Sequence, residues 1–175
     1  MKNLVLALAL SLVFTSTKAQ TMDKPKDLAT RISEIEDRIA LKELVGTFSI
    51  LADVKDVQKQ VLLFTEDARV ESISNGQAGA VLQGRKQIGE AFSNFLNLFE
   101  TVYHINGQQT LTLNSDKASG VSYCTVTLIG VENGKKMRTT MGVYYNDEYV
   151  RVNNRWLIAK RKSTFAWQDR QALIR

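Results

Sequence analysis

Residues 118–131 read ASGVSYCTVTLIGV, and residues 136–152 read KMRTTMGVYYNDEYVRV. Both segments are rich in valine, threonine and aromatic residues, a composition typical of β-strands. Asn133 and Gly134 lie between them and tolerate the backbone of a tight turn, so the two segments are predicted to pair as an antiparallel hairpin. Both predicted strands exceed the usual strand length, and strands this long twist and curl.

The same pattern extends in both directions along the chain. Val102–Leu113 and Arg155–Trp167 are two further predicted strands, and turn-forming residues at 114–116 and 153–154 connect them to the first pair. Apolar residues lie on both faces of the strand at 118–131, so we expect both faces of the sheet to be covered.

The region before these strands has the period of helices. Apolar residues recur at steps of three and four from Leu28 to Ala52, and the pattern shifts near Ala40, so one bent helix and two abutting helices both remain open. The other elements predicted from the pattern are a helix at Val57–Phe64, a strand at Ala68–Ile73, a loop at Asn75–Gly84 and a helix at Ile88–Phe99.

Helices followed by hairpin-linked strands indicate an α+β fold. We expect a cone-shaped, curved antiparallel β-sheet whose concave face is covered by the N-terminal helices, with a pocket enclosed between the two layers. Residues 28–175 are predicted to form this single domain, and the polar residues 20–27 to form a flexible lead-in.

Residues 1–19 have the features of a secretory signal peptide. Lys2 precedes an apolar run of about 11 residues, and Thr17 to Ala19 supply small residues for cleavage after Ala19. An uncleaved membrane anchor is the alternative, but a helix needs roughly 20 apolar residues to span a bilayer. We therefore expect export to the periplasm or the medium, with no stable membrane insertion after cleavage.

Charge and composition exclude several classes of function. Residues 20–132 hold 11 basic and 15 acidic groups, whereas residues 133–175 hold 10 basic and 3 acidic groups. The basic groups are spread along alternating strands, so we expect a solvated sheet face and no nucleic-acid partner. Cys124 and His104 are the one cysteine and the one histidine of the sequence, which excludes an intramolecular disulfide and a multi-histidine zinc site.

Short motifs in a fixed order link the predicted elements to a known family. They are Asp53-x-x-Asp56, Phe64-Thr65-Glu66-Asp67-Ala68, Gly84, Tyr103-His104, Asp116-Lys117-Ala118, Gly142-x-Tyr144 and Arg155-Trp156-x-Ile158-x-x-Arg161. In this order they resemble the SnoaL-like family of the nuclear transport factor 2-like superfamily, over about residues 30–167. The resemblance implies the cone fold, which hosts dehydratases, isomerases, cyclases and non-catalytic binding domains.

Within that family, the chain looks like the scytalone dehydratase and bile acid dehydratase branch. The resemblance implies that Asp53 and His104 are a catalytic pair in which the carboxylate orients the imidazole and raises its basicity, with a working pKa near neutrality. From the residues alone, a helix-end aspartate and a hydrogen-bonded strand histidine are the favoured interpretation, and only the resemblance makes a catalytic role an equal alternative. Two departures from the branch are Phe48, five residues before Asp53 where a tyrosine is often found, and threonines at 125 and 127 where a second His or Asp is placed.

Further residues are predicted to bind substrate. Phe48, Tyr123, Tyr144 and Trp167 are expected to shape the pocket, and Arg161 matches a family arginine that can hold an anionic group, with a surface ion pair as its alternative. Neither a cofactor nor a metal is expected, because the sequence has no nucleotide-binding motif and no ligand-rich loop around its paired acids.

Three functions remain open from the sequence. The first is cofactor-independent dehydration or isomerisation of a small, mostly apolar molecule. The second is non-catalytic binding of such a ligand, and the third is a dimerisation domain that pairs through the outer face of its sheet, which makes a homodimer the expected assembly.

Overall fold

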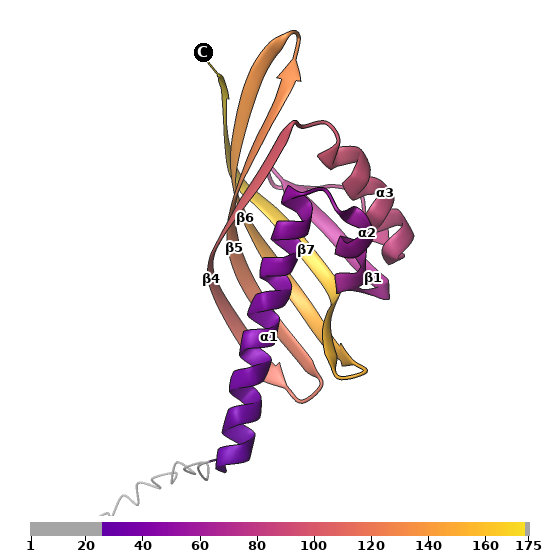
Figure 1. Cartoon of the computed structure of the whole chain (residues 1–175), viewed down its shortest axis with the longest axis vertical. Helices are drawn as coiled ribbons and strands as arrows, with labels where there is room; N and C mark the ends of the chain where they lie inside the picture. Colours follow the sequence, from indigo (N-terminus) through magenta and orange to yellow (C-terminus); the bar gives the residue numbers. More distant parts are fainter. Residues whose placement is uncertain (1–25, 174–175) are drawn as a thin grey trace, which may run out of the picture.

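The computed structural model describes residues 26–173, so the predicted signal peptide at 1–19 and most of the lead-in lie outside the described residues. Three α-helices and one short 3₁₀ helix precede or interrupt the sheet, and four long strands follow (Figure 1). In chain order the elements are α1 (Leu28–Asp53), α2 (Val57–Gln60), the short 3₁₀ helix η1 (Val61–Leu63), β1 (Phe64–Ser74), β2 (Gln77–Ala78), β3 (Leu82–Gln83), α3 (Gly84–Leu96), β4 (Thr101–Asn114), β5 (Lys117–Glu132), β6 (Lys135–Val152) and β7 (Arg155–Ala172).

Helix α1 is one continuous helix. Asp27 caps its first turn, since the side chain accepts a hydrogen bond from the Thr30 amide at 3.0 Å. Its buried residues begin at Leu41, whereas Leu28 and Ile35 in its first half are exposed. Only the N-terminal end of α1 projects beyond the sheet (Figure 1), since Asp37 accepts hydrogen bonds from Arg151 and Trp156. The pattern shift near Ala40 therefore marks a change in which side of the continuous helix carries the apolar residues, and no break in the helix.

The segments between α1 and the long strands follow the expected order with shifted ends. Asp56 caps α2, as its side chain accepts from the Lys59 amide at 3.1 Å. The strand expected at Ala68–Ile73 is longer and begins at Phe64, and the expected loop at 75–84 contains the short strands β2 and β3.

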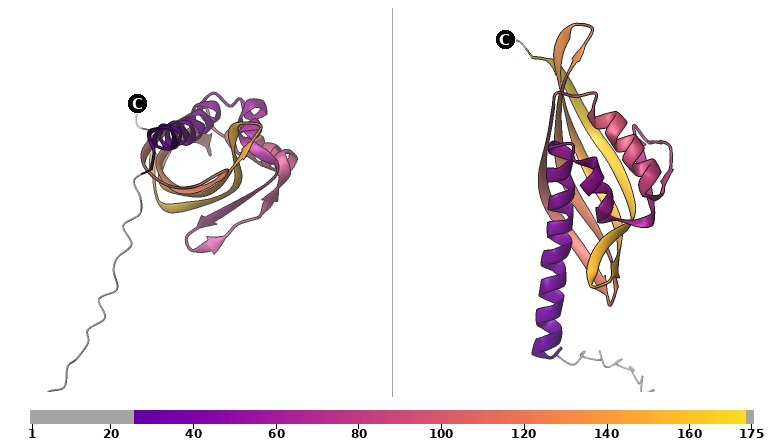
Figure 2. Two further views of the ribbon diagram at one scale, coloured as in Figure 1. Left: turned by 90° about the horizontal axis from the view of Figure 1, so that it is seen from below. Right: turned by 45° about the vertical axis from the view of Figure 1, so that its right-hand side comes forward.

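The sheet has seven strands, six of them in the order β2-β1-β7-β6-β5-β4, while β3 pairs with β1. The predicted α+β cone fold is confirmed, and the four long strands are antiparallel as expected. Strand β1 differs from the expectation because it lies parallel to β7, which makes the sheet mixed. The sheet curls around α1 when it is viewed from below, and α2 and α3 lie on the same side (Figure 2).

Bulges interrupt the alternation of faces along the long strands. Val143 of β6 pairs with Phe165 of β7, and Gly142 pairs with Trp167, so Ala166 is an extra residue on β7. One extra residue moves the following side chains to the opposite face of the sheet. This local irregularity decides which β7 residues face the helices.

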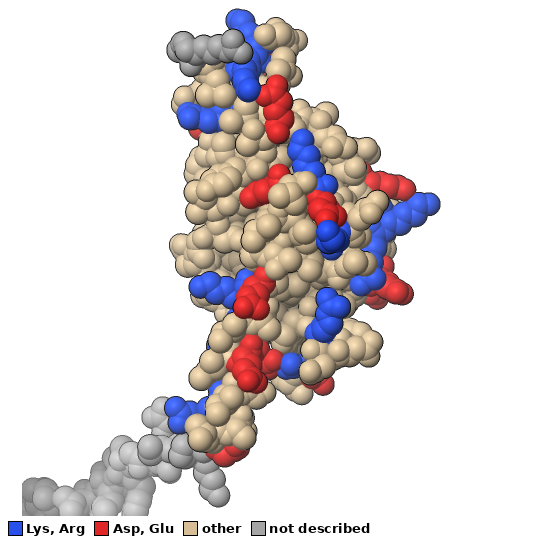
Figure 3. All heavy atoms as spheres, in the orientation of Figure 1, with Lys and Arg blue, Asp and Glu red and all other residues tan. Residues whose placement is uncertain are grey.

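The core lies between the concave face of the sheet and the helices. It contains Phe48 of α1, Ile88 of α3 and inward-facing residues of every long strand. On the side of the molecule in Figure 3, acidic and basic side chains are interspersed and form no single basic patch.

Candidate active site

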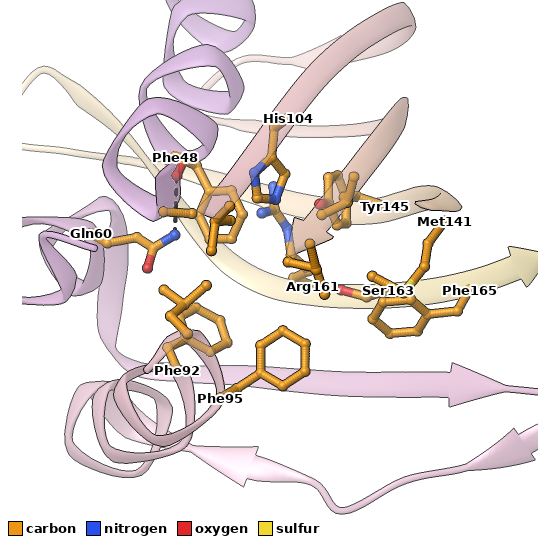
Figure 4. A pocket seen from close by; sticks show the side chains of 15 residues that line it. Phe48, Gln60, Phe92, Phe95, His104, Met141, Tyr145, Arg161, Ser163 and Phe165 are labelled. Carbon is orange, nitrogen blue, oxygen red and sulfur yellow. Dashed lines mark hydrogen bonds between the residues drawn. The ribbon is translucent and has the colours of Figure 1, made fainter. Parts of the chain in front are cut away.

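A pocket of about 130 Å³ opens between the helices and the concave face of the sheet (Figure 4). A cavity of this size is comparable to one that holds a single six-membered ring. Its walls are mostly apolar and aromatic. The lining residues are Phe48, Ala52, Gln60, Phe92, Phe95, Leu96, Val102, His104, Val126, Leu128, Met141, Tyr145, Arg161, Ser163 and Phe165.

Asp53 and His104 are in direct contact at the wall of this pocket. Asp53 is the last residue of α1, and its Oδ1 lies 2.6 Å from Nδ1 of His104. The backbone amide of His104 donates to the other carboxylate oxygen at 3.3 Å. Because Asp53 accepts the proton of Nδ1, the lone pair on Nε2 remains available to accept a proton. The geometry is that of an oriented general base.

Burial keeps His104 neutral. The side chain of His104 is 7% exposed, and this burial lowers the pKa of the imidazole below its ordinary value of 6.5. Asp53 opposes the shift through its hydrogen bond and charge, whereas the positive charge of Arg161 adds to it. The pKa of His104 is therefore lowered, whereas a working pKa raised towards neutrality was expected. Desolvation of the imidazole outweighs the effect of the Asp53 carboxylate.

Arg161 carries a fully buried positive charge beside His104. Its Nε and Nη2 donate to the carboxylate of Asp147 at 2.9 and 2.6 Å, and Tyr149 donates to the same carboxylate. The guanidinium lies between the rings of Phe48 and Tyr145, 4.2 Å from each ring centre. Nη1 has no hydrogen-bond partner among the described residues, which leaves one donor for a bound molecule.

A family model described as the SnoaL-like domain matches residues 33–162. The chain belongs to the SnoaL-like family. An uncharacterised protein of Mycobacterium tuberculosis is 25% identical over 138 residues, which cover 78% of this chain and 90% of that protein.

Two solved structures of the same fold carry the names of enzymes. A proposed scytalone dehydratase of Novosphingobium aromaticivorans superposes with a TM-score of 0.68 at 18% identity, covering 83% of this chain and 93% of that one. A hexachlorocyclohexane dehydrochlorinase superposes with a TM-score of 0.69 at 18% identity, covering 82% and 95% of the two chains. At these identities the likeness shows the fold alone.

The residues expected to bind substrate in this SnoaL-like chain divide between the two faces of the sheet. Phe48 and Arg161 line the pocket, and the ion pair of Arg161 is buried rather than at the surface. Tyr123, Tyr144 and Trp167 lie outside the pocket and border a separate hollow on the outer face, so the expectation that they shape the pocket is wrong.

Strand alternation and the bulge explain this placement. On β5 the inward residues are Cys124 and Val126, so Tyr123 points outward. Trp167 follows the inward-facing Arg161 by six residues, an even number that leads to the same face in a regular strand. The extra residue Ala166 reverses this alternation, so Trp167 points outward over Gly142. The threonines at 125 and 127 share the face of Tyr123, and Val126 stands opposite His104.

Twelve of the fifteen residues that line this SnoaL-like site were not among the predicted site residues, and Tyr145, Gln60 and Phe92 are three of them. Tyr145 lies inside, and the alternation of Met141, Val143 and Tyr145 with polar or small neighbours is the signal that singles it out. Burial raises the pKa of the Tyr145 phenol, which therefore stays protonated. Gln60 and Phe92 also line the pocket, and no local pattern distinguishes them because α2 and α3 reach it by tertiary packing.

In the part of the chain that it describes, the structure gives no role in this chemistry to the Cys124 thiol or to a metal ion. Burial raises the pKa of the Cys124 thiol to about 11, so it stays protonated. Among residues 26–173, no three His, Cys, Asp or Glu side chains are placed to hold a metal ion. Within the same range, no helix is both long and apolar enough to span a bilayer.

Proposed function

We propose that the protein binds a small, mostly apolar molecule in the pocket and that His104 removes a proton from one of its carbon atoms, in a cofactor-independent elimination or isomerisation. The contact between Asp53 and His104 at the wall of an apolar pocket carries this proposal. Asp53 orients the imidazole, and His104 is the general base.

The reaction follows from the groups at the wall. Nε2 of His104 takes the proton, and the electron pair of the broken C–H bond forms a new carbon–carbon double bond. In an elimination a leaving group departs with its own electron pair, whereas in an isomerisation His104 returns the proton to another carbon. Negative charge that develops on the departing or enolate atom is stabilised by the free N–H of Arg161.

Similar structures agree with this class of reaction. One neighbour is named as a dehydrochlorinase and another as a proposed scytalone dehydratase, and both names describe eliminations. They support the reaction class and leave the substrate open.

Non-catalytic ligand binding is the second candidate function. Among the described residues, no carboxyl group lines the pocket, and the threonines of β5 where related enzymes place a second acid face outward. A site without a carboxylic acid to protonate the leaving group suits binding alone, or a reaction whose leaving group departs as a stable anion.

The decisive experiment is native mass spectrometry of the protein with an extract of the producing cell. We expect the wild type to convert a bound small molecule, and His104→Ala and Asp53→Asn to retain it unchanged or convert it at least about 10²-fold more slowly. Asp56→Asn is the matched control, since Asp56 caps α2 outside the pocket and asparagine also caps helices. Retention of an unchanged ligand by the wild type and all three variants would instead show a binding domain.

We also propose that the protein is exported. The apolar run after Lys2 and the small residues before Gln20 support this proposal. Expression of the full chain in the producing cell, followed by N-terminal sequencing, is expected to yield a protein that begins at Gln20 outside the cytoplasm. A chain that retains Met1 would contradict it.

A further inference from the structure

Two buried polar atoms of the pocket have no hydrogen-bond partner among the described residues. One is Nη1 of Arg161, and the other is Oε1 of Gln60. Both side chains are about as buried as a side chain can be, with 1% exposure each, and both line the pocket. Unpaired buried polar atoms are costly, so a matched pair in one cavity points to a ligand that satisfies them.

The orientation of the Gln60 amide follows from its neighbour. Nε2 of Gln60 donates a hydrogen bond to the backbone carbonyl oxygen of Phe48 at 3.0 Å. A carbonyl oxygen only accepts, so the amide nitrogen must face Phe48 and the amide oxygen must point the other way. Figure 4 shows this hydrogen bond and the oxygen turned away from it.

The two unpaired atoms would bind different groups of a ligand, since one is a hydrogen-bond donor and the other an acceptor. Arg161 offers an N–H donor beside the His104 base, whereas Gln60 offers an acceptor from the α2 side (Figure 4). A ligand that satisfies both therefore carries an acceptor near the carbon that loses its proton and a donor at another position. The cavity of about 130 Å³ limits this ligand to roughly the size of one ring.

A carbonyl group fits the acceptor position. It acidifies a neighbouring C–H bond, because the electron pair left behind is delocalised onto the carbonyl oxygen. Such acidification matters here, since burial lowers the pKa of His104 and makes it a weak base. The oxygen on which charge develops would then accept a hydrogen bond from Arg161.

We propose that Gln60 determines the specificity of this site and that its substrates are ring-sized hydroxylated carbonyl compounds, whose hydroxyl donates to Oε1 of Gln60 while the carbonyl oxygen accepts from Nη1 of Arg161. The inference rests on the proposed function, because it takes the pocket to be the ligand site. It adds the substrate class and the residue that selects it.

Matched ketones test the inference in the unmodified protein. The probes are 4-hydroxycyclohexanone and 4-methylcyclohexanone, which have the same number of heavy atoms, together with the corresponding 3-substituted pair. Titrations are followed by NMR at the ring signals of His104, the one histidine of the chain. We expect at least one hydroxyl compound to bind about tenfold more tightly than its methyl partner, because the methyl group leaves Oε1 unpaired.

Variants locate the preference at Gln60. Gln60→Met preserves the length of the side chain and removes the acceptor, so the hydroxyl preference should disappear. Gln58→Met is the matched control, because Gln58 lies on the same short helix and is exposed. Gln58→Met should keep the preference of the wild type.

The outcomes separate the two proposals. Equal affinity of the wild type for hydroxyl and methyl partners, with both perturbing His104, would overturn the role of Gln60 and leave the ligand site intact. A preference that survives in a folded Gln60→Met variant would also overturn it. Failure of all four ketones to bind would overturn the substrate class inferred here, whereas the ligand-binding function is tested separately by native mass spectrometry with the cell extract.

Discussion

At the scale of single residues, two side-chain pairings determine the chemistry of the site. Asp147 neutralises Arg161 within the core, and Asp53 holds His104 through one ring nitrogen. Within residues 26–173, each pairing leaves one nitrogen at the pocket wall without a hydrogen-bond partner, Nη1 of the arginine and Nε2 of the histidine. A donor and a proton acceptor thus meet in a mostly apolar cavity, where electrostatic interactions are stronger than in water.

The titration of His104 is a prediction at this scale. Its pKa should lie below 6.5, because burial outweighs the support of Asp53 for the protonated ring. In Asp53→Asn that support is lost, so the pKa should fall further. The measurement is an NMR pH titration, and the chain contains one histidine, so assignment is unambiguous. A pKa above 6.5 in the wild type would contradict the burial argument.

The same pKa makes stability depend on pH. The unfolded chain binds a proton on His104 at about pH 6.5, whereas the folded protein binds it only at lower pH. The free energy of unfolding should therefore decrease as the pH falls from about 6.5 to the folded pKa. Urea unfolding at several pH values should show a smaller decrease in His104→Phe than in the wild type.

At the scale of elements, α1 shows that an apolar stripe does not by itself mean burial. Leu41 is fully buried, whereas Ile35 on the first half of the same helix is 56% exposed. Six residues separate them, so in one continuous helix their side chains lie about 120° apart around the axis. Leu41 faces the sheet, whereas Ile35 lies on a side of α1 that the sheet does not cover.

This contrast predicts the cost of two matched truncations. Leu41→Ala should lower the free energy of unfolding by about 2–5 kcal/mol, because it leaves a cavity in the core. Ile35→Ala should cost less than about 1 kcal/mol, since the side chain is already largely in water. Urea unfolding of both variants checks the prediction, and equal losses would show that the first half of α1 is covered in solution.

At the scale of the whole molecule, the outer face of the sheet carries the aromatic residues that the pocket does not use. Tyr123 and Tyr144 are neighbours with ring centres 5.8 Å apart, and Trp167 and Ile105 border the same hollow. Tyr123 and Trp167 are about half exposed. Exposed apolar patches of this kind are typical of interaction surfaces.

We expect this face to pair with a second copy of the chain. Sedimentation equilibrium at micromolar concentration should give a homodimer, and Tyr123→Lys should give a monomer because it places a charge in the apolar contact. Thr112→Lys is the control, since Thr112 is exposed on β4 and lies outside the hollow. A monomeric wild type would contradict the expectation.

Local patterns in the sequence were enough to predict the type, order and approximate length of the main elements. Helical steps of three and four, strand alternation and turn residues depend on neighbouring residues, so they can be recognised without the fold. The resemblance to SnoaL-like proteins added Asp53 and His104, which the structure brings into contact.

The tertiary structure decided what depends on contacts between distant segments. Strand β1 joins β7 in parallel, the bulge at Ala166 turns Trp167 outward, and Gln60 turns its amide oxygen away from Phe48 because its nitrogen is held there. None of these follows from local periodicity, because one extra residue reverses the faces of a strand and burial is set by whatever packs opposite. The pocket and its unpaired donor and acceptor are therefore properties of the assembled fold.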